Sequence, residues 1–501
     1  MNRIMTNNHY DLLIRNATII DGPRAPRFQG DIGVRDGMIA AIEPSGQLQN
    51  AGADREIDAS GNIAAPGFID VHTHDDRLLF SDPAMTPKVS QGVTTVIAGN
   101  CGISLAHSPA ARAGVITPPL DLLDNDGGWF RFPSFGAYRE ELAATPAAIN
   151  AACLVGHTTF RVAVMDKLDR PATKSEIAKM REMARESMAS GAIGVSTGTA
   201  YPPAASAPTE EIIEVCRPLT EFGGLYVTHM RNEDDQIIDS IEETCAIGRS
   251  LNVPVVISHH KTVGIRNHGR STETLALIEQ RMREQPVCLD CYPYIASSTV
   301  LRYDRLAQSS RVIITWSKPH PEFSGVDLDE VARRLGMSQA EAVEKIKPAG
   351  AIYFMLDEKD VQRILAFDET MIGSDGLPHD AKPHPRLWGT FPRVLGHYAR
   401  DLKLFTLETA VYKMTGLPAK KFGLTGRGVL QKGTHADITL FDAASVIDAA
   451  DFRNSTEPAK GIDTVICNGE PVWANGKATG ARPGKVLLNE GQRAAARGLP
   501  R

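Results

Sequence analysis

The sequence predicts an α/β protein: a (β/α)8 TIM-type barrel with a small β domain assembled from both chain ends and an inserted helical segment. Three observations support this fold class. Residues 67–424 alternate short apolar strands with helical stretches, whereas residues 10–44 and 426–478 read as short alternating strands joined by tight turns. In addition, polar side chains that can bind metals follow several of the central strands, which is where the chemistry of such barrels is found.

The two chain ends have the same pattern of strands and turns. Residues 11–20 and 30–42 alternate apolar and polar side chains, with the turn pair Asp36-Gly37 between two strands. Residues 436–441 and 464–473 repeat this pattern, with a turn at Asn468-Gly469. Because the ends of a domain usually lie close together in space, residues 1–66 and 425–501 are predicted to form one small β domain. Two independent hairpin arms are the alternative.

The central region, residues 67–424, is predicted to be the catalytic barrel. The expected strands lie at 68–71, 94–99, 150–156, 194–198, 224–228, 253–258, 287–292 and 370–374. Helical apolar spacing is clearest in residues 176–190 and 234–250. A doubly wound open sheet is the runner-up, but no glycine-rich dinucleotide fingerprint follows the first strand. Residues of about 303–352, with helical stretches at 327–335 and 339–347, are interpreted as a lid-like insertion.

The bulk composition is that of a soluble globular protein. Hydrophobic residues make up 42% of the 501 positions and charged residues 23%. A net charge of −6 argues against a nucleic-acid partner, and no apolar run of about 18 residues is present to predict a membrane partner. The first residues lack a secretory apolar core, and seven scattered cysteines do not suggest a disulfide framework. A cytoplasmic location is therefore expected, while the oligomeric state stays open.

His72 and His74 are the most informative pair in the chain. They directly follow the apolar stretch Phe68–Val71, which is expected to be a strand. Side chains at positions i and i+2 of a strand point the same way, so the two imidazoles leave one strand end together. Neutral imidazole is the commonest metal ligand in proteins. The pair therefore predicts part of a metal site.

Further candidate ligands follow later strands. Cys101 comes after the second strand, His229 after the fifth, His259 after the sixth and Asp375 after the eighth. The carboxyl ends of barrel strands converge, and histidine, thiolate and carboxylate together suit Zn²⁺. His259 and His260 point to opposite faces of their strand, so we expect His259 to be the ligand and His260 to support it or pack in the core.

Several longer motifs resemble one family. The chain is similar to the N-acyl-D-amino-acid deacylases, a branch of the metal-dependent amidohydrolase superfamily, over essentially its whole length. The motif at the eighth strand is long and specific. The motifs that carry the resemblance are Gly99–Gly102, Gly194–Pro203, His229–Glu233, Ser258–Lys261 and Gly373–Gly389.

The resemblance implies a ligand arrangement. It implies one tight zinc held by Cys101, His229 and His259. It also implies a second, weaker metal position formed by His72, His74 and Asp375. Many members of the superfamily bridge two metals with a carboxylated lysine, and in this branch a cysteine takes that place. Whether turnover needs one metal or two is left open.

The expected reaction is hydrolysis of the amide bond of an N-acyl-D-amino acid to a carboxylate and a free D-amino acid. Zinc lowers the pKa of a bound water to about 7. Asp375 is the expected general base and acid, which takes the proton from the attacking water and returns it to the leaving amine. The preference for D over L follows only from the resemblance.

A small-molecule N-acyl amino acid also needs groups that hold its carboxylate. Lys261 and Arg386 are expected to bind this charge, and arginine adds bidentate geometry. Tyr292 and Ser298 are expected to add hydrogen bonds, with Ser297 an alternative to Ser298. Contacts to the acyl group or the amino-acid side chain are considered for three more residues: His157, Arg302 and Arg305.

Three alternatives remain open at this point. In the first, the enzyme is restricted to N-acyl-D-glutamate or N-acyl-D-aspartate, and an arginine at 302 or 305 would favour such an acidic side chain. In the second, it is another amidohydrolase that acts on cyclic amides or carbamoyl compounds, although Cys101 stands where a bridging lysine would be expected. A catalytically silent scaffold is disfavoured because all six candidate metal ligands are present.

Overall fold

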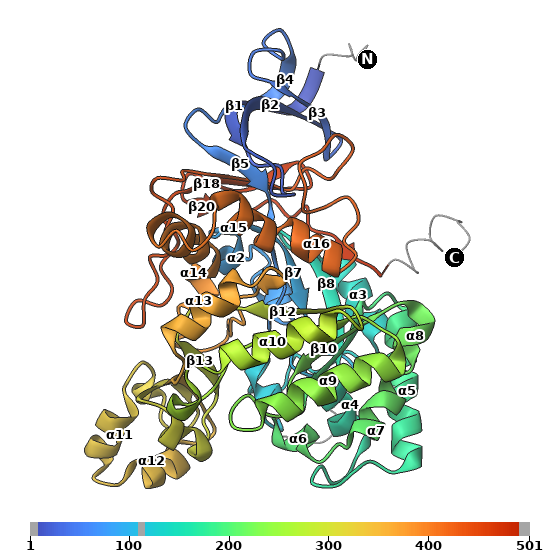
Figure 1. Ribbon diagram of the computed structural model, residues 1–501, viewed down its shortest axis with the longest axis vertical. Coiled ribbons are helices and arrows are strands. Elements are labelled where there is room, and N and C mark those ends of the chain that lie inside the picture. Colours follow the sequence, from blue (N-terminus) through green and yellow to red (C-terminus); the bar gives the residue numbers. More distant parts are fainter. Residues whose placement is uncertain (1–8, 109–115, 490–501) are drawn as a thin grey trace.

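The computed structural model describes residues 9–108 and 116–489 (Figure 1). Its strands form two nine-stranded sheets and one three-stranded sheet. The first large sheet is the small β domain at the top of Figure 1, and the second is the barrel below it. The predicted fold class is confirmed.

The barrel consists of eight parallel strands that each bury nearly all their side chains. Their order in the sheet follows the chain from β6 to β12, with β16 at the far end. The strands are β6 (Phe68–Asp70), β7 (Val93–Ala98), β8 (Asn150–Gly156), β9 (Gly194–Gly198), β10 (Leu225–His229), β11 (Val255–Ile257), β12 (Val287–Cys291) and β16 (Thr370–Ile372). The ring closes just beyond β6 and β16, where Thr73 bridges Gly376 and the Asp375 amide donates to the His72 carbonyl at 2.8 Å.

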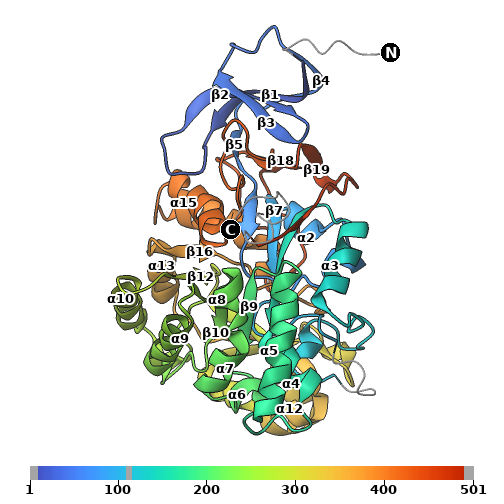
Figure 2. The same cartoon turned by 90° about the vertical axis from the view of Figure 1, so that its right-hand side faces the viewer.

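Helices cover the outside of the barrel (Figure 2). The predicted helices are found as α5 (Lys174–Ala189), which starts with a capping box of Thr173 and Glu176, and α9 (Ile237–Leu251). The others around the barrel are α1 (Leu78–Ser81), α2 (Thr86–Val89), α3 (Phe135–Ala144), α4 (His157–Val164), α6 (Pro202–Ala205), α7 (Thr209–Cys216), α8 (Pro218–Phe222), α10 (Ser271–Met282), α13 (Glu358–Ala366), α14 (Arg386–Arg393), α15 (Leu407–Met414) and α16 (Gly416–Lys421). Alternation of strand and helix thus places every strand end at one mouth.

The small β domain joins strands from both ends of the chain in one sheet. The order is β20-β19-β18-β17-β5-β1-β2-β3, and β4 pairs with β1. The N-terminal strands are β1 (His9–Ile19), β2 (Phe28–Arg35), β3 (Met38–Pro44), β4 (Gly52–Asp58) and β5 (Ile63–Pro66). The C-terminal strands are β17 (Ile438–Phe441), β18 (Ile462–Cys467), β19 (Glu470–Ala474) and β20 (Lys477–Ala478). Antiparallel pairing of β5 with β17 joins the two sets.

One part of the C-terminal segment leaves this sheet. Residues Val486–Leu487 form β21, which pairs in parallel with β8 of the barrel. The side chain of Asn150 in β8 also accepts from the Lys485 amide at 3.1 Å. The chain therefore returns to the barrel after β20, which the alternating pattern of the C-terminal segment did not indicate.

The insertion lies at the mouth end of the barrel and is built from strands as well as helices (Figure 1, lower left). It contains β13 (Ala296–Val300), β14 (Arg311–Ser317) and β15 (Ala349–Phe354), with α11 (Leu328–Leu335) and α12 (Gln339–Ile346). The two predicted helical stretches are thus present. The three-stranded sheet was not predicted, because its antiparallel pairing joins segments far apart in the sequence, and β13 begins before the predicted start at about 303.

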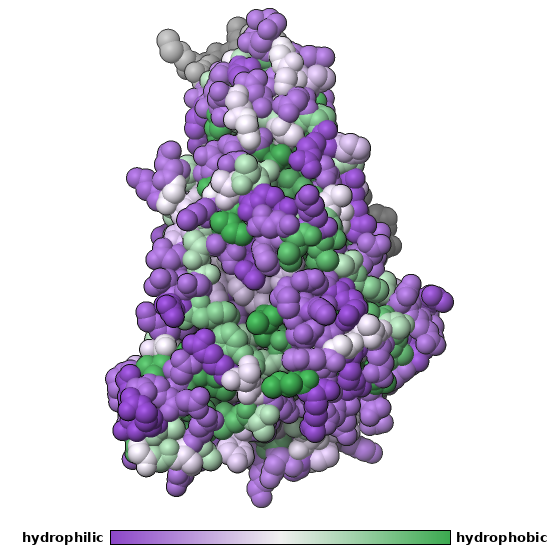
Figure 3. Space-filling view, turned by 60° about the vertical axis from the view of Figure 1, so that its left-hand side comes forward, coloured by the Kyte–Doolittle hydropathy of each residue, from purple (hydrophilic) through white to green (hydrophobic). Residues whose placement is uncertain are grey.

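The described residues contain no helix long and apolar enough to cross a membrane. On the face drawn in Figure 3, hydrophobic residues form separate patches among hydrophilic ones. Such a mixed surface is usual for a globular protein.

Candidate metal centre

Each predicted metal ligand lies at the mouth end of a barrel strand. His72 and His74 follow β6, and Cys101 follows β7. His229 is the last residue of β10, His259 lies just after β11 and Asp375 just after β16. All six side chains are buried. The topology of the barrel therefore brings together residues that are 303 positions apart in the chain, from 72 to 375.

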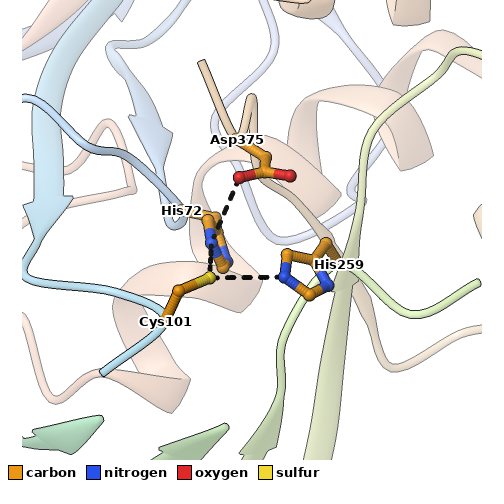
Figure 4. A group of neighbouring side chains, drawn as sticks. All are labelled: His72, Cys101, His259 and Asp375. Carbon is orange, nitrogen blue, oxygen red and sulfur yellow. Dashed lines mark hydrogen bonds and ion pairs between the residues drawn. The ribbon is translucent and has the colours of Figure 1, made fainter. Parts of the chain in front are cut away.

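Cys101 lies between two histidines (Figure 4). Its Sγ is 3.2 Å from the Nε2 of His72 and 3.3 Å from the Nε2 of His259. Burial alone would raise the pKa of the Cys101 thiol, but the charges of His72 and His259 outweigh it and hold this pKa well below its usual value. The thiolate is the form of cysteine that binds metals. Cys101 therefore contacts His72 on one side and His259 on the other, in the form that can bind a metal.

Asp375 completes one side of the cluster. Its Oδ1 lies 3.5 Å from the Nε2 of His72 and 3.3 Å from the Nε2 of His74, and its Oδ2 lies 2.9 Å from Arg386. Burial would raise the pKa of this carboxyl, but Arg386 and the hydrogen bond with His74 outweigh burial and lower it well below its ordinary value. Asp375 is thus a carboxylate in the substrate-free site.

Glu233 completes the other side, and the sequence analysis did not single it out. Its Oε1 lies 3.1 Å from the Nδ1 of His259 and accepts from Lys261 at 2.6 Å. Its Oε2 is 3.6 Å from the Nε2 of His229. Burial opposes ionisation of Glu233, but the positive charge of Lys261 outweighs burial and holds the pKa of Glu233 well below the usual range. The sequence feature that could have identified Glu233 is its position four residues after His229 in the same motif.

The loops that present the ligands adopt an uncommon backbone conformation. Cys101, His259 and Asp375 have φ values of 54°, 35° and 49°, in the left-handed region. This conformation costs of order 1–3 kcal/mol for a residue with a side chain and persists only where surrounding contacts impose it. The Asp290 carboxylate imposes it at His259 by accepting from its amide at 2.9 Å. Such strained positions cluster at functional sites.

The residues present fit a bound metal ion. His229 is buried, and neither of its ring nitrogens has a hydrogen-bond partner among the described residues. Burial lowers the pKa of His229, so its imidazole is neutral and has a free lone pair. Two groups of side chains each have donor atoms that all lie within 4.8 Å of one another, and both groups include His259. The first group is His72, Cys101, His259 and Asp375, and the second is His229, Glu233 and His259. Mixed nitrogen, sulfur and oxygen donors suit Zn²⁺.

The predicted substrate-binding residues fall into two groups. Lys261 and Ser298 line a small cavity of ≈ 30 Å³ beside His229, and so do Ser297 and Arg305. Tyr292 and Arg386 are almost fully buried behind it, where the Arg386 guanidinium packs on the Tyr292 ring at 4.6 Å. Arg386 contacts two residues that line the cavity: it pairs with Asp375 at 2.9 Å and donates to the Ser298 carbonyl at 3.1 Å.

Three other residues lie farther from the ligands. His260 turns outward and its Nε2 pairs with Thr274 of α10 at 2.9 Å, in agreement with the opposite orientation expected for neighbours on a strand. His157 is fully buried at the start of α4, 3.5 Å from Glu211. Arg302 pairs with Asp304 at 2.7 Å in a separate hollow.

A buried ionic network supports the first strand end. Lys88 lies 2.8 Å from Asp70, 3.3 Å from Asp75 and 2.9 Å from the Ser374 hydroxyl, and all of these side chains are buried. Asp70 also accepts from the Ser374 amide at 2.8 Å. The network therefore ties the loop that carries His72 and His74 to the loop that carries Asp375.

Comparisons with known proteins all point to one enzyme family. Residues 55–261 and 319–473 match the model of the amidohydrolase family. A D-aminoacylase of Alcaligenes xylosoxydans xylosoxydans is 61% identical over 95% of this chain and 97% of its own. A solved D-aminoacylase structure, described for its binuclear metal centre, is 58% identical, with a TM-score of 0.92, and covers 96% of this chain and 100% of its own.

A third relative carries zinc. The N-acyl-D-glutamate deacylase of Bordetella bronchiseptica, solved with zinc and a phosphonate mimic of the tetrahedral intermediate, is 44% identical with a TM-score of 0.92. It covers 96% of this chain and 100% of its own.

Proposed function

This chain belongs to the amidohydrolase family, and from that premise we propose that it hydrolyses N-acyl-D-amino acids to a carboxylate and a free D-amino acid. The observation that carries the proposal is Cys101, whose Sγ lies 3.2 Å and 3.3 Å from two histidines, where relatives that act on cyclic amides would have a bridging lysine. The identity of 61% to a D-aminoacylase over 95% of this chain supports the same substrate class.

We propose that the ligands hold zinc in two positions of unequal strength. Cys101, His229 and His259 would form the tight position, and His72, His74 and Asp375 the weaker one. The contact of Cys101 with His259 at 3.3 Å and that of Asp375 with His74 at 3.3 Å support this division. Zinc, when bound, lowers the pKa of a water to about 7 and polarises the substrate carbonyl. The binuclear centre described for the solved D-aminoacylase supports two positions, and the zinc in the glutamate deacylase supports the choice of metal.

Asp375 would act as general base and acid. The carboxylate accepts a proton from the attacking water as the water oxygen bonds to the amide carbon. It then delivers that proton to the amine nitrogen as the carbon–nitrogen bond breaks, which leaves a carboxylic acid and a free amine. Arg386, 2.9 Å from Asp375, orients the carboxylate toward the two histidines.

The α-carboxylate of the substrate would be bound from the opposite side of the cavity. Lys261 and Ser298, together with Arg305, present their polar groups there. Tyr292 and Arg386 would support this side from behind, with the Tyr292 hydroxyl free of hydrogen bonds among the described residues. Restriction to D-glutamate or D-aspartate is the second candidate, because Arg305 at the cavity would pair with an acidic side chain.

A substrate panel tests the proposal. Zinc-loaded enzyme is assayed on N-acetyl-D and N-acetyl-L forms of methionine, leucine, glutamate and aspartate. Cleavage confined to D forms is the expected result, and the ratio of apolar to acidic substrates decides between the two candidates. Absence of cleavage of every member by enzyme with stoichiometric zinc would contradict the proposal and favour a cyclic-amide substrate or a silent scaffold.

A further inference from the structure

A second hollow lies beside the metal centre, with a much larger volume. It measures ≈ 640 Å³, and its lining includes residues at the start of α6 and in the insertion. The cavity at the candidate ligands is much smaller, at ≈ 30 Å³. A long acyl group would therefore need room beyond that cavity.

The hollow and the cavity at the metal centre share one wall residue, Tyr201. This residue lines both spaces, and its ring lies 4.9 Å from the His229 ring. Its hydroxyl pairs with the Thr299 hydroxyl at 3.1 Å. Ser298 and Thr299 of β13 line the metal cavity, while Val300 and the following Leu301 line the hollow. The two spaces are therefore neighbours along β13, with Tyr201 as their common wall.

The hollow has an apolar wall and no unbalanced charge. Its lining includes Leu301, Tyr303 and Pro348, and 60% of Tyr303 is exposed to solvent. Arg302 is neutralised by Asp304 at 2.7 Å, and Lys347 by Glu344 at 2.8 Å. An anionic group has no free cation to bind among these residues. The lining therefore suits a hydrocarbon chain.

Asp121 is the other acidic residue in the lining, and burial changes its pKa. The pKa of Asp121 is raised to about 7 because its carboxyl is buried, so near neutral pH a large share of this group is uncharged. This agrees with the apolar character of the wall.

We propose that this hollow binds the acyl chain of the substrate, and that the enzyme accepts medium-length fatty acyl groups. The inference rests on the proposed deacylase function. Two observations favour the acyl chain over the amino-acid side chain. The volume lies within the range of sites for drug-sized ligands and exceeds the needs of one side chain. The outer end is bordered by the exposed Tyr303, so chains of different lengths can project outward.

The first experiment varies the acyl group. We expect kcat/KM of zinc-loaded enzyme to rise from N-acetyl- to N-butanoyl-, N-hexanoyl- and N-octanoyl-D-methionine, by about fourfold for each methylene that is buried. A parallel series keeps the acetyl group and changes the side chain from D-alanine to D-methionine and D-phenylalanine. A flat acyl series would overturn the proposal.

Two variants locate the effect. Leu301→Trp fills the hollow, and Tyr303→Ala removes an exposed wall without disturbing the core. Each should lower kcat/KM for the octanoyl substrate at least about tenfold and leave the acetyl substrate within about twofold. Phe28→Ala, an exposed aromatic of the small β domain, is the control and should change neither. If the variants alter the side-chain series instead, the hollow binds the amino-acid side chain and the proposal is wrong.

A binding measurement separates this inference from the proposed function. Calorimetry on the zinc-loaded enzyme should give a Kd for octanoate at least about tenfold lower than for acetate, and Tyr303→Ala should remove most of this difference. If the D-substrate panel is not cleaved but octanoate binds in this way, the function is wrong and the apolar site stands. If octanoate binds no more tightly than acetate, the acyl site is wrong even though the panel is cleaved.

Discussion

The two halves of the candidate metal centre are supported by different parts of the molecule. The Asp375 half, which consists of His72, His74 and Asp375, is fixed from behind by the buried network of Lys88 with Asp70 and Asp75. The Glu233 half, which consists of His229, His259 and Glu233, is supported from the cavity side by Lys261. Cys101 joins the halves at 3.2 Å and 3.3 Å.

The two kinds of support have different consequences for the metal centre: one fixes the ligands from the interior, and the other leaves its charged groups at the cavity. Charges buried in the interior hold the Asp375 half, and replacing any of them leaves an unpaired buried charge. Glu233 and Lys261 are also buried, but they line the cavity itself, where a substrate would contact them. Loss of the first kind of support should affect folding, and loss of the second kind should affect metal and substrate.

Removal of one ligand from each half gives the largest expected contrast. His259→Ala should lose stoichiometric zinc on dialysis, because it removes a ligand of the proposed tight position. His72→Ala should keep about one zinc per chain, since Cys101, His229 and His259 remain. Zinc is measured by atomic absorption on dialysed protein. Equal loss of zinc from both variants would contradict the assignment of the tight position to the Glu233 half.

Asp375→Asn is expected to have the next largest effect. The amide cannot accept the proton of the attacking water, so kcat should fall by about 10²–10⁴-fold. Zinc content should stay near that of the parent, because the tight position does not include Asp375. The measurement pairs steady-state kinetics with metal analysis of the same sample. Turnover within about twofold of the parent would rule out the general-base role.

Lys88→Met tests the interior support of the Asp375 half. The variant leaves Asp70 and Asp75 buried without their cation, and we expect a loss of about 3–5 kcal/mol in the free energy of unfolding. Lys318→Met is the control, because Lys318 is exposed and lies 3.9 Å from Asp126. It should change stability by less than about 1 kcal/mol. Urea unfolding of both metal-loaded variants measures the difference, and similar midpoints would show that the network has no special role.

The barrel and the cluster of candidate ligands could be predicted from the sequence because both depend on repeated local patterns. Strand and helix periods alternate along residues 67–424, and ligand-type residues follow the strands. Support for the ligands was not visible, because Lys88, Asp70 and Asp290 look like ordinary charges until folding buries them together. The strands of the insertion and the pairing of β21 with β8 depend on long-range partners, which no local pattern specifies.

The smallest expected contrast concerns the carboxylates that contact the ligand imidazoles. Glu233 lies 3.1 Å from the Nδ1 of His259, whereas Asp290 lies 3.5 Å from the Nδ1 of His72. Glu233→Gln should weaken zinc binding by about 10–100-fold, because a partner on the second ring nitrogen fixes the tautomer and raises ligand basicity.

Asp290→Asn should weaken the tight zinc less, because Asp290 contacts the ring of His72, which lies outside the proposed tight position. Its amide oxygen can also still accept from the His259 backbone. Because the pKa of Glu233 lies well below its ordinary value, Glu233 is ionised throughout the range from about pH 6 to 8, and the effect of Glu233→Gln should be constant there. Zinc affinity from competition with a chelator at each pH measures both variants. A larger effect of Asp290→Asn than of Glu233→Gln would place the tight zinc in the Asp375 half and contradict the proposed assignment.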